Sequence, residues 1–86
     1  MKRIYKYSVE VRDEQDIYLP VGAEILSVAE QYNRIVLYAI VDSEAETKPH
    51  HISVRGTGHE LNDKEGRFIG TVKLYNGDLM FHVFCE

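Results

Sequence analysis

The chain has 86 residues, with 14 acidic and 10 basic side chains and a formal net charge of −4 at pH 7. This length predicts one domain, residues 1–86, whose thin core needs support from a disulfide, a metal or self-association. The negative charge argues against a general nucleic-acid binder, which carries a basic face. Because Cys85 is the only cysteine, no internal disulfide can form, and we expect a homo-oligomer.

Cysteine use and hydropathy also predict where the protein acts. The sequence shows no signal peptide, and its longest apolar run, residues 35–41, is far too short to span a bilayer. With one free thiol, these features predict the reducing cytoplasm and no membrane partner. Acidic residues gather at 13–16, 42–46 and 63–65, and we expect these stretches to be solvated loops.

The first third of the chain reads as strands joined by short turns. Residues 4–11 alternate between apolar and polar side chains, which predicts a half-buried strand. Residues 17–19 form a short strand that Pro20 confines to a sheet edge, because proline cannot donate to the ladder. Residues 23–32 have apolar spacing that fits either a helix or a strand, and the missing side-chain N-cap favours the strand.

The middle of the chain predicts two more strands. After a turn at Asn33, residues 34–42 are apolar on both faces, as in the centre of a sheet that is covered on both sides or by another subunit. Residues 42–49 read as a polar loop long enough to be mobile. Residues 50–55 alternate again, with Ile52 and Val54 inward and Ser53 and Arg55 outward.

The last segment, residues 67–85, reads as a β-hairpin closed by Asn76-Gly77, a dipeptide that favours a type I′ turn. The turn sets a register with one largely apolar face. On that face the paired residues are Leu74 with Leu79, Val72 with Phe81, Gly70 with Val83, and Phe68 with Cys85. The other face pairs Lys73 with Met80, Thr71 with His82, and Ile69 with Phe84. About six or seven short strands predict an all-β antiparallel sandwich or barrel.

Residues 56–59, Gly-Thr-Gly-His, are the segment most typical of a ligand site. Glycines on both sides of Thr57 let main-chain amides point at an anion, as in a nest. Arg55 before the segment and His59 after Gly58 add groups that suit a phosphate or a carboxylate. The plainer interpretation is a tight turn that needs positive φ at its glycines, which is the commoner role of turn glycines.

The aromatic content has two interpretations. Six tyrosines and three phenylalanines suit a subunit interface or a stacking pocket, and they also suit ordinary cross-strand packing. If the chain binds a nucleotide-like ligand, Tyr38 or Tyr75 would stack the base and Lys73 would assist with the anion.

No catalytic or metal-binding pattern stands out. The four histidines and the single cysteine lack the spacing of a zinc site. Cys85 and His82 lie three apart on one strand and so face opposite ways, which prevents a nucleophile–base pair. Asp13, Glu14 and Asp16 lack the glycine and the terminal glutamate of a calcium loop. We therefore expect a protein that is not an enzyme and carries no metal or cofactor.

Short segments along the chain form an ordered set: residues 4–7, 19–23, 25–28, 37–42, 56–59, 68–72 and 82–84. Taken in this order, they resemble a family of small uncharacterised proteins of tailed bacteriophages. The family more often has tryptophan where this chain has Tyr38, and proline where it has Glu60. The resemblance covers nearly the whole chain and implies a phage origin, with no catalytic residues to carry over.

Small phage proteins of this kind often counter host defences, so the resemblance implies two hypotheses. In the first, the chain inhibits bacterial antiviral defence in the host cytoplasm by sequestering an anionic or nucleotide-like molecule in an oligomer. Arg55, Thr57, Gly58 and His59 would then contact the anion. The alternative is a protein-interaction module that blocks a host protein directly or serves in the virion. Neither hypothesis involves long nucleic acid.

Overall fold

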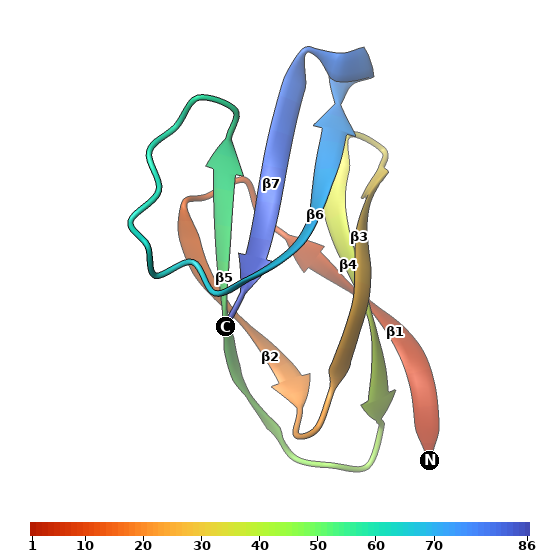
Figure 1. The fold of residues 1–86 in the computed structure, drawn as a ribbon. Helices are drawn as coiled ribbons and strands as arrows, with labels where there is room; N and C mark the ends of the chain where they lie inside the picture. The colour runs from red at the N-terminus through yellow and green to blue at the C-terminus, as the bar shows by residue number, and fades with distance from the viewer.

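The computed structural model describes residues 1–86 and confirms an all-β fold of seven strands in two antiparallel sheets (Figure 1). The strands are β1 (Lys2–Val9), β2 (Glu14–Pro20), β3 (Glu24–Gln31), β4 (Arg34–Asp42), β5 (Thr47–Gly56), β6 (Arg67–Leu74) and β7 (Leu79–Cys85), and a short turn, η1 (Tyr75–Gly77), joins the last two. The strand orders are β1-β4-β3 in the first sheet and β2-β5-β7-β6 in the second. The structure contains no helical segment that could span a lipid bilayer.

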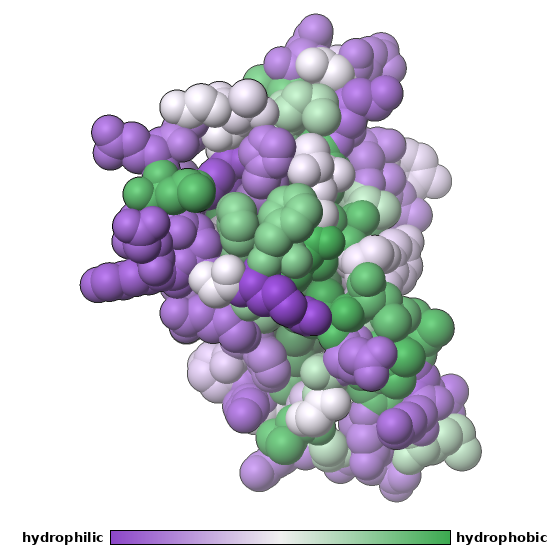
Figure 2. Space-filling model, viewed as in Figure 1, coloured by the Kyte–Doolittle hydropathy of each residue, from purple (hydrophilic) through white to green (hydrophobic).

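The core lies between the facing sheets and is thin. The molecule measures 15 Å along its shortest axis, and only 17 of its 86 residues are buried. Alternate residues of the strands point inward, as a period of two requires. The cluster they form contains Val9, Ile35, Leu37, Ala39, Val41, Ile52, Val54, Val72, Leu74, Val83 and Cys85. Figure 2 shows apolar side chains through the middle of one face, with polar side chains around them.

The two sheets come together most closely along β3 and β6. Gly70 of β6 makes this approach possible, because a Cβ there would lie 2.9 Å from Cγ2 of Val28 on β3. The hairpin tips are also joined, since the main-chain N–H of Tyr75 donates to Oδ1 of Asn33 at 3.0 Å. The opposite edges of the sheets, β1 and β2, pair with no further strand.

Most strand predictions are confirmed. Residues 23–32 contain β3 and no helix, β2 lies at a sheet edge and ends at Pro20, and β4 is the central strand of its sheet. Asn33 occupies a turn with φ of +60°. The first strand ends earlier than expected, at Val9, which leaves Val11 exposed.

Two segments expected to be loops are partly strand. The predicted polar loop at 42–49 is wrong in its second half, because β5 already begins at Thr47 and pairs with β2 from there. The predicted acidic turn is also wrong, because Glu14 and Asp16 belong to β2 and face Ser53 and His51. Both predictions are wrong for the same reason: an exposed edge strand carries the same polar residues as a loop, so the two cannot be told apart by polarity.

The hairpin register is confirmed from Leu74–Leu79 back to Gly70–Val83. Asn76 and Gly77 take positive φ, as a type I′ turn requires, and Tyr75 does so too. Beyond Gly70 the register is wrong, because a β-bulge lies between Phe68 and Gly70. A bulge adds one residue to one strand. Phe68 therefore faces Phe84, and Arg67 faces Cys85.

Candidate functional site

Arg55 is buried and fully engaged within the chain. The residue is only 6% exposed, and its Nε and Nη2 lie 3.1 and 3.0 Å from Oε2 of Glu65. Nη1 donates to the main-chain oxygens of Asp13 (2.6 Å) and Val54 (3.2 Å), and Nη2 also donates to Glu14. No nitrogen of this guanidinium is free for an anion, so the geometry gives Arg55 a structural role.

Glu14 extends the same charged network across the outer face of β2 and β5. Hydrogen bonds from His51 (2.6 Å) and Arg55, with a further one from Ser53 (2.9 Å), hold the pKa of Glu14 at about 2. The other ring nitrogen of His51 lies 3.0 Å from Oδ1 of Asp16. Hydrogen bonds to Glu14 and Asp16 in turn raise the pKa of His51. These groups engage one another on this face, and one carboxylate oxygen of Asp16 is left without a partner.

The Gly-Thr-Gly-His segment forms a tight turn. The N–H of His59 donates to the carbonyl of Gly56 at 3.0 Å, and Gly58 has φ of +89°, as at the third position of a type II turn. The N–H of Thr57 donates to the carbonyl of Met80 at 3.4 Å. Because two of its amides are used in this way, the segment lacks the converging free N–H groups of an anion nest.

The other predicted ligand residues do not converge on this turn. The hydroxyl of Thr57 lies 2.8 Å from Nε2 of His82 and is engaged there. Lys73 lies on β6, and Tyr75 lies at the hairpin tip. Tyr38 lies on β4 in the other sheet, on the face away from the core. A pocket that combined Tyr38 with the turn would need a second copy of the chain.

The histidine and cysteine side chains form neither a metal cluster nor a Cys–His pair. No group of three or more histidine, cysteine, aspartate or glutamate side chains is placed to hold a metal ion. Cys85 points into the core and His82 points away from it, as the strand pattern predicts. Burial raises the pKa of the Cys85 thiol, which keeps it protonated and weakly reactive.

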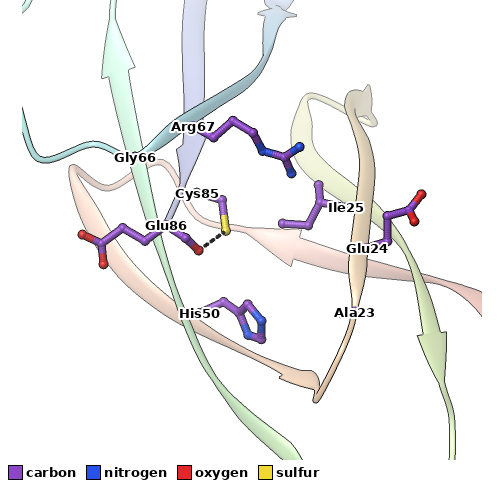
Figure 3. A pocket seen from close by; sticks show the side chains of 8 residues that line it. All are labelled: Ala23, Glu24, Ile25, His50, Gly66, Arg67, Cys85 and Glu86. Atoms are coloured by element: carbon purple, nitrogen blue, oxygen red, sulfur yellow. Dashed lines mark hydrogen bonds between the residues drawn. The ribbon is translucent and has the colours of Figure 1, made fainter.

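A cleft of about 620 Å³ opens at one end of the sandwich, where β5 and β7 lie across from the start of β3 (Figure 3). This volume falls within the range of about 300–1,000 Å³ that is usual for small-molecule sites. The lining residues are Ala23, Glu24, Ile25, His50, Gly66, Arg67, Cys85 and Glu86.

The side chains in the cleft present basic groups around an apolar floor. In Figure 3, Arg67 and His50 lie on opposite sides of the Cys85 thiol and reach toward β3, while Glu24 and Glu86 turn their carboxylates away. Nδ1 of His50 lies 3.1 Å from the carbonyl of Lys48 and donates to it, so Nε2 of the neutral ring carries a lone pair and donates only when the ring is protonated. The Arg67 side chain makes neither an ion pair nor a hydrogen bond. The cleft therefore offers the guanidinium of Arg67 as a free donor, while the main-chain oxygen of Glu86 lies beside it, 3.3 Å from Sγ of Cys85.

The β-bulge in β6 places Arg67 at this position. Without it, Phe68 would face Cys85 and close the cleft with an aromatic ring. With the bulge, Phe68 turns to the outer face and packs edge-on against Phe84, with ring centroids 5.5 Å apart. Gly66, with φ of +86°, lets the chain approach β7, because a Cβ there would lie 2.7 Å from the carbonyl oxygen of Cys85.

Sequence reasoning did not single out this cleft. His50 stands two residues before Ile52, so period-two alternation places it on the inner face, and a polar residue at an inward position was the available signal. Arg67 had no such signal, because its inward position depends on the bulge. An unpaired guanidinium and a histidine beside an apolar floor suit a small anion that has an apolar part.

The chain was also compared with known proteins. Residues 1–86 match the model of a family described as a domain of unknown function, DUF7352. No curated protein and no solved structure matches the chain. The family description gives no source and no activity, so the phage origin stays a prediction.

Proposed function

The chain belongs to the DUF7352 family, and we propose that it is a binding protein for a small organic anion, held in the cleft between β3, β5, β6 and β7. The observation that carries the proposal is the pair Arg67 and His50. Both point into the cleft with nitrogens that no carboxylate occupies, while the neighbouring glutamates turn away (Figure 3).

The shape of the cleft defines the ligand class. A phosphate or carboxylate group would lie against the guanidinium of Arg67, since charge-assisted hydrogen bonds to anions are the strong ones, and the protonated ring of His50 would donate to the same group from Nε2. An apolar or aromatic part of the ligand would pack against Ile25 and Cys85. Free inorganic phosphate lacks this second part and should bind more weakly than a nucleoside monophosphate or a carboxylic acid with a hydrocarbon body.

Such binding fits sequestration, because holding a signal molecule needs a site and no catalytic group. The proposal that the ligand is a nucleotide-like signal of bacterial antiviral defence, bound in the host cytoplasm, rests on the resemblance to phage proteins. The alternative, a module that blocks a host protein, predicts instead a stoichiometric partner from host lysate. Native mass spectrometry of protein from expressing cells separates the two, since a sequestered molecule would be released on denaturation.

The direct experiment is isothermal titration calorimetry at low ionic strength with three probes: nucleoside monophosphates, short-chain fatty acids and inorganic phosphate. We expect at least one organic probe to bind, and Arg67→Gln to weaken it about tenfold or more, the usual effect of losing a charged hydrogen bond. His50→Gln should weaken it less.

Lys73→Gln is the matched control, because it also removes one positive charge, from a residue that the sequence predicts to contact the anion and that lies outside the cleft. It should leave the affinity unchanged. Unchanged binding in Arg67→Gln, loss of binding in Lys73→Gln, or no binding of any probe at millimolar concentration would contradict the proposal.

A further inference from the structure

Each sheet of the sandwich has two edge strands, of which β3 and β6 pack against each other. β1 borders the first sheet and β2 borders the second, both on the side away from the close contact between β3 and β6. An unpaired edge offers a row of main-chain N–H and C=O groups to another strand. These two edges are independent of the cleft and of the ligand proposed for it.

The groups at each edge follow from the ladder. The carbonyl of Met1 accepts from Ser43, on the β4 side, so alternation leaves the main-chain groups of Lys2, Ile4, Lys6 and Ser8 at the free edge of β1. The carbonyl of Asp13 accepts from Val54, on the β5 side, so the groups of Glu14, Asp16 and Tyr18 lie at the free edge of β2. Pro20 follows in the same phase, where its missing N–H costs no ladder bond.

The two edges carry opposite charges. β1 contains three basic residues and no acidic residue, whereas β2 contains two acidic residues and no basic residue. Lys6 contacts only the neutral amide of Gln31, at 2.6 Å. Asp16 uses Oδ1 toward His51 and keeps its other oxygen free. The outward apolar side chains on these edges are also exposed to solvent, Ile4 by 62% and Tyr18 by 63%.

We propose that β1 of one copy pairs antiparallel with β2 of a second copy. The best register places Lys6 opposite Asp16 and Ile4 opposite Tyr18, because it joins opposite charges and covers both exposed apolar side chains. Each of these positions has its main-chain groups at the free edge, so the same register satisfies the ladder. When each copy contributes its β1 edge to one interface and its β2 edge to the other, the dimer has two identical interfaces and no free edge for a third copy.

A second copy presenting β2 fits better than one presenting β1. Two β1 strands would bring six basic side chains together without a carboxylate, and registers centred on Arg3 or Lys6 place identical basic residues directly opposite. Self-association also suits this chain, because a domain with only 17 buried residues gains stability from burying more surface.

The experiment is sedimentation velocity on the full chain across micromolar concentrations, with Lys6→Glu and Asp16→Lys made separately. Wild type should assemble, and each variant alone should dissociate about tenfold more readily, because like charges then face each other in both interfaces. An equimolar mixture of the two variants should assemble again, since one interface of the mixed dimer joins the two substituted side chains, which have opposite charges, and the other keeps the wild-type contact of Lys6 with Asp16. Lys64→Glu, an equal charge change in the β5–β6 loop, should behave as wild type.

Recovery on mixing also shows that both variants are folded, which removes loss of structure as an explanation. A wild-type chain that stays monomeric, variants that assemble as wild type does, or a mixture that fails to recover would each overturn the proposal. Capture of an unrelated acidic strand by a monomeric wild type would assign the β1 edge to a different partner and overturn it as well.

Discussion

Arg55 and Arg67 have the same side chain and opposite surroundings. Arg55 is 6% exposed, with its nitrogens held by Glu65, Glu14 and two main-chain carbonyls. Arg67 is exposed at the rim of the cleft and has no partner in the chain. A guanidinium that is already neutralised stabilises the fold, whereas one without a carboxylate can attract an anion.

This difference also separates the two faces of the second sheet. On the outer face, Glu14 and His51 compensate each other, and the pKa values of both are shifted toward the charged form. At the end of the inner face, Arg67 and His50 have no such compensation. Charge alone is therefore a poor guide to a binding site, and the partners of each charge decide its role.

The largest expected effect is at Gly66, which positions Arg67. Gly66→Ala should lower the free energy of unfolding by about 3 kcal/mol, of which about 1 comes from the positive φ and the rest from the clash with the carbonyl of Cys85. Gly58→Ala is the matched control, because Gly58 also has positive φ but nothing lies within 4 Å of its added Cβ. Urea denaturation of both variants measures the difference, and equal losses would show that the contact at Gly66 is not rigid.

Replacing the two arginines tests the comparison itself. Arg55→Ala should cost about 2 kcal/mol of stability, because it leaves Glu65 and two main-chain carbonyls without their donor. Arg67→Ala should change stability by less than about 0.5 kcal/mol, as expected at an exposed position without a partner. Thermal and urea unfolding provide both values, and a larger loss in Arg67→Ala than in Arg55→Ala would reverse the assigned roles.

The smallest effect is a dependence of stability on pH through the network of His51 and Glu14. The pKa of His51 is raised from 6.5, so its contribution is present below 6.5 and is lost as pH rises through the raised value. The pKa of Glu14 is lowered from 4.5 to about 2, so its contribution is present above 4.5 and is lost as pH falls toward 2.

Together these shifts predict maximum stability between about pH 5 and pH 6. His51→Gln should remove about 0.5 kcal/mol there, a value typical of partly exposed ion pairs, and should flatten the decline above pH 6.5. His59→Gln, which removes a histidine without an ion pair, serves as the control. A decline that persists unchanged in His51→Gln would show that another group causes it.

The sequence was sufficient to predict most of the strands, because period-two alternation and the turn residues are local signals. Asn76-Gly77 set the hairpin register as far as Gly70, and the apolar residues of β4 marked a central strand. The bulge at Ile69 was missed although Gly70 stands directly after it, because a glycine inside a strand is equally typical of a bulge, a bend or a close approach of another segment. The position of Arg67 depends on that bulge, so the cleft was missed as well.

The prediction of an anion site at residues 55–59 is wrong for a second physical reason. Arg55 and His59 flank two glycines, a pattern typical of anion sites, yet the carboxylates that engage Arg55 come from Glu14 and Glu65, 41 and 10 residues away. Long-range pairing of this kind is set by the strand register of β2 with β5, which the sequence did not reveal because Glu14 was taken for a loop residue.

The most direct test of the account is a nitrogen–proton NMR titration of the full chain with the tightest-binding organic anion. If the cleft is the binding site, amide signals of Ile25, Gly66, Arg67 and Cys85 shift with one common dissociation constant, while those of residues 55–59 stay in place. Shifts confined to residues 55–59 would restore the Gly-Thr-Gly-His turn as the binding site and contradict the role of the cleft.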